Sequence, residues 1–227
     1  MTYLYRILCL LGGYICGLLE TGVLYGKMKG VDIRKSGSGN TGTTNALRVL
    51  GPKAGLIVFL GDFLKSFIPC LVVRFIFKSD YPDSFLLYVL YTGFGAVLGH
   101  VFPFYLKFKG GKGVATIAGT IVGLLIPKMI LILLVLFVIV VALTKYVSLG
   151  SILLMVEFLT LYIIFAFQGW LCFDPDVNSS YKAMIESIVI AALFALLSIA
   201  RHKTNIRRLL NHEENKLHFK HSEEAKS

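Results

Sequence analysis

Three polar stretches of this sequence carry residue types and spacings suited to binding phosphate. The first contains GSGNTG, residues 37–42. Small residues let successive backbone N–H groups point into one concavity, which favours anions. Arg48 follows, and its planar guanidinium group can bind phosphate through paired hydrogen bonds. The candidate site residues in this stretch are Gly37, Ser38, Gly39, Asn40, Gly42, Asn45 and Arg48.

GSGNTG also matches G-x-G-x-x-G, the pattern of a dinucleotide-binding turn. That motif requires a preceding strand, a following helix and an acidic residue about 20 residues further on. Here the pattern follows an apolar segment and a charged linker, and the residue 20 positions beyond Gly42 is Asp62, inside another apolar segment. The context therefore argues against a dinucleotide site. The remaining alternative to a phosphate-binding loop is a flexible loop of turn-forming residues.

The second stretch is GHVFPFYLKFKGGKGVAT, residues 99–116, in which glycines again accompany a cation. It is not a Walker A motif, because Lys112 is followed by glycine rather than by Ser or Thr. We expect a second phosphate-binding turn with Lys112 as its point charge, and we expect Lys107 and Lys109 to reach lipid headgroups. The candidate site residues are His100, Gly110, Gly111 and Lys112. A lone histidine at the end of an apolar segment is usually structural, so we expect His100 to support the site.

The third stretch is RHKTNIRRLLNHEE, residues 201–214. His202 and Asn205 are three residues apart, so they share a face if the preceding helix continues through them. For Arg207 and Arg208 we favour contact with anionic lipid over contact with a substrate. His202 and Asn205 are therefore the candidate site residues of this stretch.

Composition places the chain in a membrane. Its residues are 56% hydrophobic and its mean hydropathy is +0.75, which is more apolar than a soluble domain can cover with polar surface. The net charge of +10 would suggest nucleic acid for a soluble protein, but here it indicates basic loops and an anionic lipid or substrate, with no nucleic-acid partner. The apolar segments are Leu4–Leu24, Ala54–Phe77, Phe85–Val101, Val114–Ile126, Met129–Leu143, Leu149–Phe167 and Ile185–Ala200.

The distribution of cations predicts how these segments cross the membrane. If all seven cross, 17 of the 23 Lys and Arg residues fall in loops on one side and five on the other, with Lys65 inside a span. Val114–Ile126 is shorter than the usual span of about 20 residues, but without its crossing the basic C-terminal segment would leave the basic side. We therefore expect seven transmembrane helices, with the N-terminus outside and the C-terminus cytoplasmic. Within the second span, Asp62 and Lys65 are expected to pair.

Several kinds of catalytic motif are missing from the sequence. It has no metal-ligand cluster, no H-x4-D acyltransferase motif and no metal motif of the alcohol phosphotransferase type. We therefore expect that the protein handles phosphorylated, amphiphilic substrates without a metal or other cofactor.

The three polar stretches closely resemble the signature motifs of the bacterial acyl-phosphate–glycerol-3-phosphate acyltransferase family. The matching residues are GSGNTGTTNALR, GHVFPFYLKFKGGKGVAT and RHKTNIRRLL, in the same order, together with the YVSLGS turn at residues 146–151. The resemblance spans nearly the whole chain. It implies one all-α membrane domain over residues 1–227, in the plasma membrane, with its active site on the cytoplasmic face. There are three departures: Thr41 stands where a proline or apolar residue is usual, His212 stands where glycine is expected, and the tail runs long.

The resemblance also implies a reaction. A fatty acyl group would pass from acyl phosphate to the 1-hydroxyl of glycerol 3-phosphate, giving lysophosphatidic acid and phosphate, the first step of phospholipid synthesis. By position, the implied catalytic residues are Ser38, Lys112, His202 and Asn205, and Arg48 and Ser151 are implied substrate contacts. We assign Ser38, Lys112 and the glycine loops to the acyl phosphate, and the other implied residues to glycerol 3-phosphate. The proton acceptor stays open between His202 and a substrate phosphate oxygen, and direct transfer is favoured over an acyl-enzyme on Ser38.

Two other classes of function fit parts of the sequence. A transporter of organic phosphates would also use basic loops and helices broken by glycine, but transporters bind near the membrane midplane and usually show paired halves. The sequence shows no internal repeat, and its polar groups gather at one face. A non-catalytic lipid-binding scaffold would explain the charge but not the loops rich in Ser, Asn and Gly.

Overall fold

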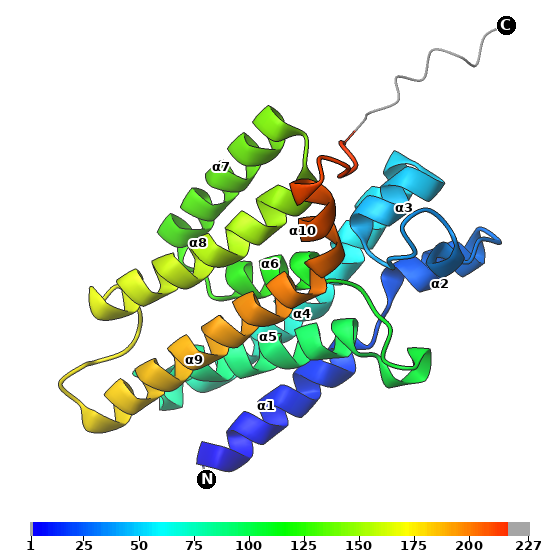
Figure 1. Cartoon of the computed structure of the whole chain (residues 1–227). Coiled ribbons are helices and arrows are strands. Elements are labelled where there is room, and N and C mark those ends of the chain that lie inside the picture. Colours follow the sequence, from blue (N-terminus) through cyan, green and yellow to red (C-terminus); the bar gives the residue numbers. More distant parts are fainter. Residues whose placement is uncertain (1, 218–227) are drawn as a thin grey trace, which may run out of the picture.

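The computed structural model describes residues 2–217, and this part of the chain is built from helices and turns without strands. Figure 1 shows long helices packed side by side, with the short helices α2, α3 and α10 at one end. The helices are α1 Thr2–Gly17, α2 Thr21–Met28, α3 Thr43–Leu50, α4 Pro52–Asp80, α5 Phe85–Val101, α6 Val114–Gly123, α7 Pro127–Thr144, α8 Val147–Phe167, α9 Asn178–Arg201 and α10 Lys203–Leu210, with 3-10 turns η1 Ile33–Lys35 and η2 Phe104–Leu106.

Six segments of the described chain are long and apolar enough to cross a membrane, so the protein is a multi-pass, all-α membrane protein as predicted. α6 corresponds to the short fourth predicted segment and has only 10 residues. The six segments are Tyr3–Met28, Pro52–Asp80, Phe85–Leu106, Pro127–Thr144, Val147–Phe167 and Asn178–Arg201.

The first predicted segment, Leu4–Leu24, is not one continuous helix. α1 ends at Gly17 and α2 begins at Thr21, and buried Glu20 lies between them. A helix end leaves backbone carbonyls without partners, and these must be satisfied inside a membrane protein. Here the Tyr105 hydroxyl donates to Leu18 O at 2.6 Å, and Lys65 Nζ donates to Leu19 O at 2.8 Å. The periodicity of apolar residues cannot show this break, because it depends on partners from distant loops and helices.

α5 is the central helix of the bundle. In its apolar stretch 78% of the residues are buried, against 11% for α7, so α5 is surrounded by protein and α7 is largely exposed. α1, α4, α6 and α9 all pack on α5. In Figure 1, α7 lies at the edge of the molecule beside α8. α5 therefore supplies the fixed core from which the loop after Val101 emerges.

α1 and α5 approach each other closely along two pairs of glycines. A Cβ atom added to Gly13 or Gly17 would lie 1.9 or 2.1 Å from a backbone oxygen of α5. A Cβ atom added to Gly95 or Gly99 would lie 2.0 or 2.2 Å from a backbone oxygen of α1. Each pair is spaced four residues apart, which is the small-xxx-small pattern that allows membrane helices to pack backbone against backbone.

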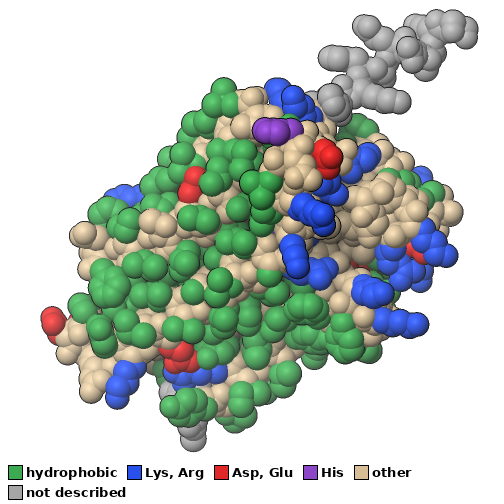
Figure 2. Space-filling model, in the orientation of Figure 1, with side chains coloured by type: hydrophobic (Ala, Val, Ile, Leu, Met, Phe, Trp, Pro, Cys, Tyr) green, Lys and Arg blue, Asp and Glu red, His purple; other side chains and the backbone are tan. Residues whose placement is uncertain are grey.

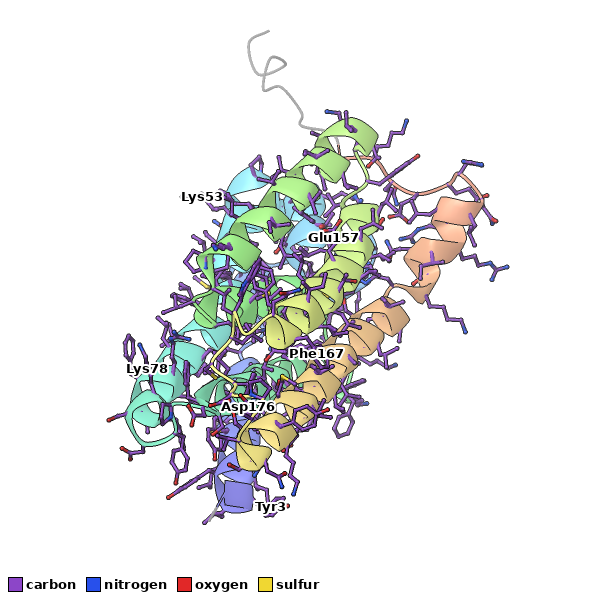
Figure 3. All side chains as sticks on the ribbon, turned by 90° about the vertical axis from the view of Figure 1, so that its left-hand side faces the viewer. Tyr3, Lys53, Lys78, Glu157, Phe167 and Asp176 are labelled. Carbon is purple, nitrogen blue, oxygen red and sulfur yellow. The ribbon has the colours of Figure 1, made fainter. Side chains whose placement is uncertain are left out.

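Charged residues mark the two ends of the bundle. Figure 2 shows hydrophobic side chains along the length of the visible face, with most of the visible Lys and Arg residues gathered towards the end that carries α10 and α2. In Figure 3, Lys53 lies near this end of α4, whereas Lys78 and Tyr3 lie towards the opposite end. Two of the basic residues counted from the sequence, Lys220 and Lys226, lie outside the described residues.

Adjacent glycines in α1 give a test of the close helix contact. Gly13→Ala should lower the melting temperature of the purified protein by several degrees, because a methyl group at this position overlaps the α5 backbone and overpacking typically costs about 1–3 kcal/mol. Gly12→Ala is the matched control, since an added Cβ there has no neighbour within 4 Å. Thermal unfolding in detergent measures both. Equal melting temperatures for the two variants would contradict the packing.

Candidate functional site

The first polar loop, residues 36–42, is organised around the side chain of Asn45. Asn45 Oδ1 accepts a hydrogen bond from Ser38 N at 2.8 Å, and its Nδ2 donates to three backbone oxygens, those of residues 33, 36 and 40. Gly37 has φ +59° and an added Cβ would lie 2.4 Å from Asn45 Oδ1, so this position needs glycine. The amide of Asn45 is thus committed to shaping the loop, whereas Ser38 and Arg48 are exposed.

The second polar loop runs from the end of α5 to the start of α6 and places Lys112 just before α6. Gly110 N donates to Val101 O at 3.1 Å, and Gly111 N donates to His100 O at 3.2 Å. Gly113 has φ +83°, which ends the loop in a left-handed residue directly before α6. The backbone is thus folded back on the end of α5, and Lys112 extends from the side of the loop that faces α10.

The third polar stretch brings its side chains to Lys112. α9 ends at Arg201 and α10 begins at Lys203, so the helix does not continue unbroken through His202. His202 and Asn205 are nevertheless both buried, and Lys112 Nζ donates a hydrogen bond to Asn205 Oδ1. Arg201 Nη2 also donates to Gly110 O, at 3.2 Å. The second and third polar stretches therefore form one connected site.

His202 has a defined tautomer in its neutral form. Its Nδ1 lies 2.7 Å from Ser198 O, and a carbonyl oxygen only accepts, so Nδ1 carries the proton. Nε2 is then free to accept a hydrogen bond. Burial, followed by repulsion from Lys112, lowers the pKa of His202 to about 4, so this imidazole is neutral near pH 7.

Glu214 belongs to this site and was not singled out from the sequence. Its Oε1 accepts from Asn205 Nδ2 at 2.9 Å and its Oε2 accepts from Arg208 Nε at 2.8 Å. Burial alone would raise the pKa of Glu214, but these two hydrogen bonds outweigh it and the pKa is lowered. The carboxylate comes close because the chain reverses after α10 through His212, which has φ +58°.

Lys112 lies in a strongly positive environment. Burial lowers the pKa of Lys112 to about 8, and repulsion from Arg208, Arg201 and Arg48 acts in the same direction, against the attraction of Glu214. Its direct partner, the Asn205 amide, carries no charge. Because the cations around Lys112 outnumber the carboxylates that act on it, the arrangement favours binding of an anion, above all a phosphate with two charges.

A cavity of about 550 Å³ adjoins this cluster, between the first and second polar loops. Ser38, Gly39, Asn40, Gly110 and Arg201 contribute to its wall. Lys107 and Lys109, which were expected at lipid headgroups, line it too, together with the basic residues Arg34 and Lys35. Asp32 also lines the cavity and pairs with Arg34 at 3.0 Å, but the cations outnumber this carboxylate. The cavity therefore has an excess of positive charge and offers space for a polar, anionic molecule next to the loops.

Three predicted site residues have their side chains engaged elsewhere. Asn45 is committed to the first loop as described above. His100 is buried, and its Nδ1 lies between Glu20 and Lys65 rather than in the cavity. The Ser151 hydroxyl is buried in α8 and donates to Val147 O at 2.8 Å. The remaining predicted residues lie in the two glycine loops or in the cluster around Lys112.

Comparisons with known proteins account for this combination of fold and site. A family model described as glycerol-3-phosphate acyltransferase matches residues 7–212. The chain belongs to the glycerol-3-phosphate acyltransferase family. The resemblance drawn from the three polar stretches is thereby confirmed, since the match includes all of the first two and nearly all of the third.

Individual members of the glycerol-3-phosphate acyltransferase family are similar over nearly their full length. The glycerol-3-phosphate acyltransferase of Fusobacterium nucleatum is 42% identical over 207 residues, covering 91% of this chain and 95% of the relative. That of Chlorobium phaeobacteroides is 38% identical over 221 residues, covering 91% and 94%. A crystal structure of PlsY (YgiH), an integral membrane glycerol 3-phosphate acyltransferase, in its glycerol 3-phosphate form superposes with a TM-score of 0.77 at 32% identity, covering 94% of this chain and 96% of that one. Its lysophosphatidic acid form gives 0.74.

The turn at His212 tests how this family member brings Glu214 into the site. Glycine is expected at this position, and His212 has the left-handed backbone that glycine favours. His212→Gly should change stability by less than about 1 kcal/mol, because the strain it relieves is offset by a more flexible unfolded chain. His212→Val should destabilise the protein, since a β-branched residue rarely adopts positive φ. Melting temperatures in detergent measure both, and a His212→Val variant as stable as His212→Gly would show that the turn is not left-handed in solution.

Proposed function

We propose that the protein transfers a fatty acyl group from acyl phosphate to the 1-hydroxyl of glycerol 3-phosphate, giving lysophosphatidic acid and phosphate. The observation that carries this proposal is the Lys112 cluster, in which a half-buried ammonium group donates to a neutral amide and lies near three arginines and one carboxylate, Glu214. Such a cluster suits a substrate phosphate. Further support comes from the relatives named for glycerol 3-phosphate and from the PlsY structures in glycerol 3-phosphate and lysophosphatidic acid forms.

The proposed chemistry is direct transfer. The 1-hydroxyl oxygen attacks the acyl carbonyl carbon, the bond from that carbon to the phosphate oxygen breaks, and phosphate leaves with the electron pair. Acyl phosphate is a mixed anhydride with a good leaving group, so the enzyme contributes mainly alignment and charge stabilisation. We assign Lys112, Ser38 and the backbone N–H groups of the two loops to the acyl phosphate. Arg48, His202 and Asn205 are assigned to glycerol 3-phosphate, and Ser151, whose hydroxyl donates to Val147 O, is left out of the assignment.

The hydroxyl proton has two candidate acceptors. His202 Nε2 is unprotonated and available, but the pKa of His202, lowered by burial to about 4, makes it a weak base in the free protein. A phosphate monoester has its second pKa at about 6, so a substrate phosphate oxygen is the stronger base of the two. We therefore propose that His202 accepts a hydrogen bond that orients the substrate, and that the proton passes to phosphate.

The geometry favours this reaction over transport. The cavity is lined by the loops that follow α2 and α5, and Lys112 contacts Asn205 of α10. The short helices α2, α3 and α10 lie at one end of the bundle (Figure 1). A transporter of organic phosphates would place its binding groups near the midplane.

We further propose that α6 is a seventh crossing and that the site faces the cytoplasm of a cell whose plasma membrane holds the protein. Lys112 lies in the loop just before α6, and the other end of α6 is capped by Arg74, whose Nη1 donates to Leu124 O at 2.6 Å. Arg74 lies in the half of α4 towards Lys78, at the end opposite Lys53 (Figure 3). These contacts at its two ends support a crossing by α6 together with its flanking residues. The bias of basic residues towards the site end supports a cytoplasmic orientation.

The choice of acyl donor tests the proposed reaction. Purified protein supplied with palmitoyl phosphate and glycerol 3-phosphate should form lysophosphatidic acid and release one phosphate per product. Palmitoyl-CoA should not replace palmitoyl phosphate, and omission of glycerol 3-phosphate should abolish phosphate release. Product formation is measured by chromatography of the lipid. Folded protein that forms no product with either donor would overturn the enzymatic assignment and favour a transporter.

The charge of Lys112 predicts a pH dependence. Burial lowers the pKa of Lys112 to about 8, so in the free enzyme the ammonium form predominates below that pH and is lost above it. kcat/KM, which reports the free enzyme, should therefore fall about tenfold per pH unit above pH 8. Lys112→Arg is the control: arginine stays charged, so this variant should be less active at pH 7 but should lack the fall above pH 8. An unchanged fall in the arginine variant would assign it to another group.

A further inference from the structure

A second group of buried charged residues lies beneath the glycine loops and has no part in the proposed chemistry. Glu20, Asp62, Lys65 and His100 are each at most 7% exposed. Lys65 Nζ lies 3.0 Å from Asp62 Oδ1 and 3.7 Å from Glu20 Oε1. His100 Nδ1 lies 3.0 Å from Glu20 Oε1 and 2.7 Å from Lys65 Nζ. The predicted pairing of Asp62 with Lys65 is confirmed, but it is only part of a larger network.

The network joins three separate parts of the fold. Glu20 lies at the break between α1 and α2, Asp62 and Lys65 lie within α4, and His100 lies in the last turn of α5. Charged groups inside a membrane protein are expensive and usually serve a function. An apolar set of residues could pack these helices together without that cost, so the position of the network needs a reason.

The network directly contacts the loop that carries Lys112. Gly111 N donates to His100 O, and a Cβ atom added to Gly111 would lie 2.2 Å from His100 Nε2. The imidazole therefore lies directly against the backbone of the residue that precedes Lys112. A protonated His100 Nδ1 can donate to Glu20, and an unprotonated Nδ1 can accept from Lys65, so the ring is held in place in either neutral tautomer.

The same network also reaches the first glycine loop. The Cβ position of Gly111 is 3.2 Å from Thr41 Oγ1, and Thr41 belongs to the GSGNTG loop. Gly22, two residues after Glu20, packs so closely that an added Cβ would lie 1.8 Å from Thr41 O. The break between α1 and α2 therefore places Glu20 against the imidazole of His100. It also places Gly22 against the backbone of the first loop.

We propose that Glu20, Lys65 and His100 are positioning residues, which hold the Gly110–Gly113 backbone so that Lys112 meets the substrate phosphate in the reactive geometry. This inference rests on the proposed function of Lys112. It gives the kinked first span a purpose, since a continuous helix would not leave Glu20 facing His100 at the base of the loop. The fixed ring then acts as a platform for Gly111, where only a residue without a side chain fits.

Glu20→Gln tests the proposal, because it keeps the shape of the side chain but removes its charge. We expect kcat to fall roughly 10- to 100-fold, since a misplacement of about 1 Å can cost about 100-fold in rate. The pH at which kcat/KM begins to fall should also shift, because the variant alters the surroundings of Lys112. Loss of stability alone would move neither quantity in protein that is still folded at the assay temperature.

Glu186→Gln is the matched control. Glu186 accepts hydrogen bonds from Arg6 at 2.7 Å and from the Tyr91 hydroxyl at 2.6 Å, so it too is a carboxylate paired between helices, but it lies on α9 far along the chain from the glycine loops. It should lower the melting temperature while leaving kcat and the pH profile unchanged. Should Glu20→Gln not fold, Glu20→Asp provides the test, because it keeps the charge but withdraws it from His100, and it should show the same two kinetic changes in weaker form.

Each outcome decides between specific ideas. A folded Glu20 variant with wild-type kcat and an unmoved pH break would overturn the positioning role, while an active wild-type enzyme would leave the proposed function intact. A Glu20 variant that behaves like Glu186→Gln would also overturn it and assign the network to stability. Wild-type protein that is inactive with acyl phosphate would overturn the proposed function and, with it, this inference.

Discussion

Inside a membrane bundle each charge must be satisfied by the protein or by what the protein binds, and buried Lys65 and half-buried Lys112 meet that constraint differently. Lys65 lies among Asp62, Glu20 and His100, so its charge is fully matched within the fold. Lys112 is paired with the neutral amide of Asn205 and is repelled by neighbouring arginines. Lys65 is structural, because its neighbours in the fold already compensate its charge and leave no need for a bound anion. Lys112 suits an anion because the cations near it outnumber the single carboxylate, Glu214, that attracts it.

Close backbone contact allows the surroundings of Lys65 and those of Lys112 to lie next to each other. Glycines let α1 pack against α5, which brings the break at Glu20 beside His100. Glycines in the second loop let its backbone rest on the same histidine. A side chain at either contact would separate the layers by a few ångströms, and electrostatic interactions weaken as the separation grows. The glycines thus have a role in electrostatics as well as in packing.

The sequence predicts the long helices well, because each needs only a run of apolar residues that is visible locally. α5 has the predicted bounds, Phe85–Val101, and the other long helices differ from prediction mainly at their ends. The break after Gly17 was missed because its cause lies in Tyr105 and Lys65, far away in the chain. The number of crossings also could not be settled locally, since α6 is short and depends on its neighbours for burial.

The candidate site was predicted unevenly for a similar reason. Lys112, His202 and Asn205, which the structure brings into one cluster, could be selected because reactive residue types beside glycines or in a helical pattern are visible in the sequence. Glu214 was missed, because only the reversal of the chain at His212 turns a tail carboxylate towards Asn205. Asn45 was read as a substrate contact, but the structure commits its amide to four hydrogen bonds within its own loop. A sequence shows where a polar residue stands, but it does not show which group that residue will hydrogen-bond.

The charge balance of the site also bears on the proposed chemistry. In the free protein, burial and mutual repulsion lower the pKa values of Lys112 and His202, so both groups hold their protons weakly. A bound dianion reverses both effects: it attracts the ammonium form of Lys112 and supplies an oxygen that is more basic than the imidazole. The negative charge of a bound substrate thereby compensates the excess positive charge that the fold leaves around Lys112. In the proposed reaction a strong protein base is unnecessary, because the acyl donor has a good leaving group, and a candidate site of one lysine, several arginines and backbone N–H groups suits that chemistry.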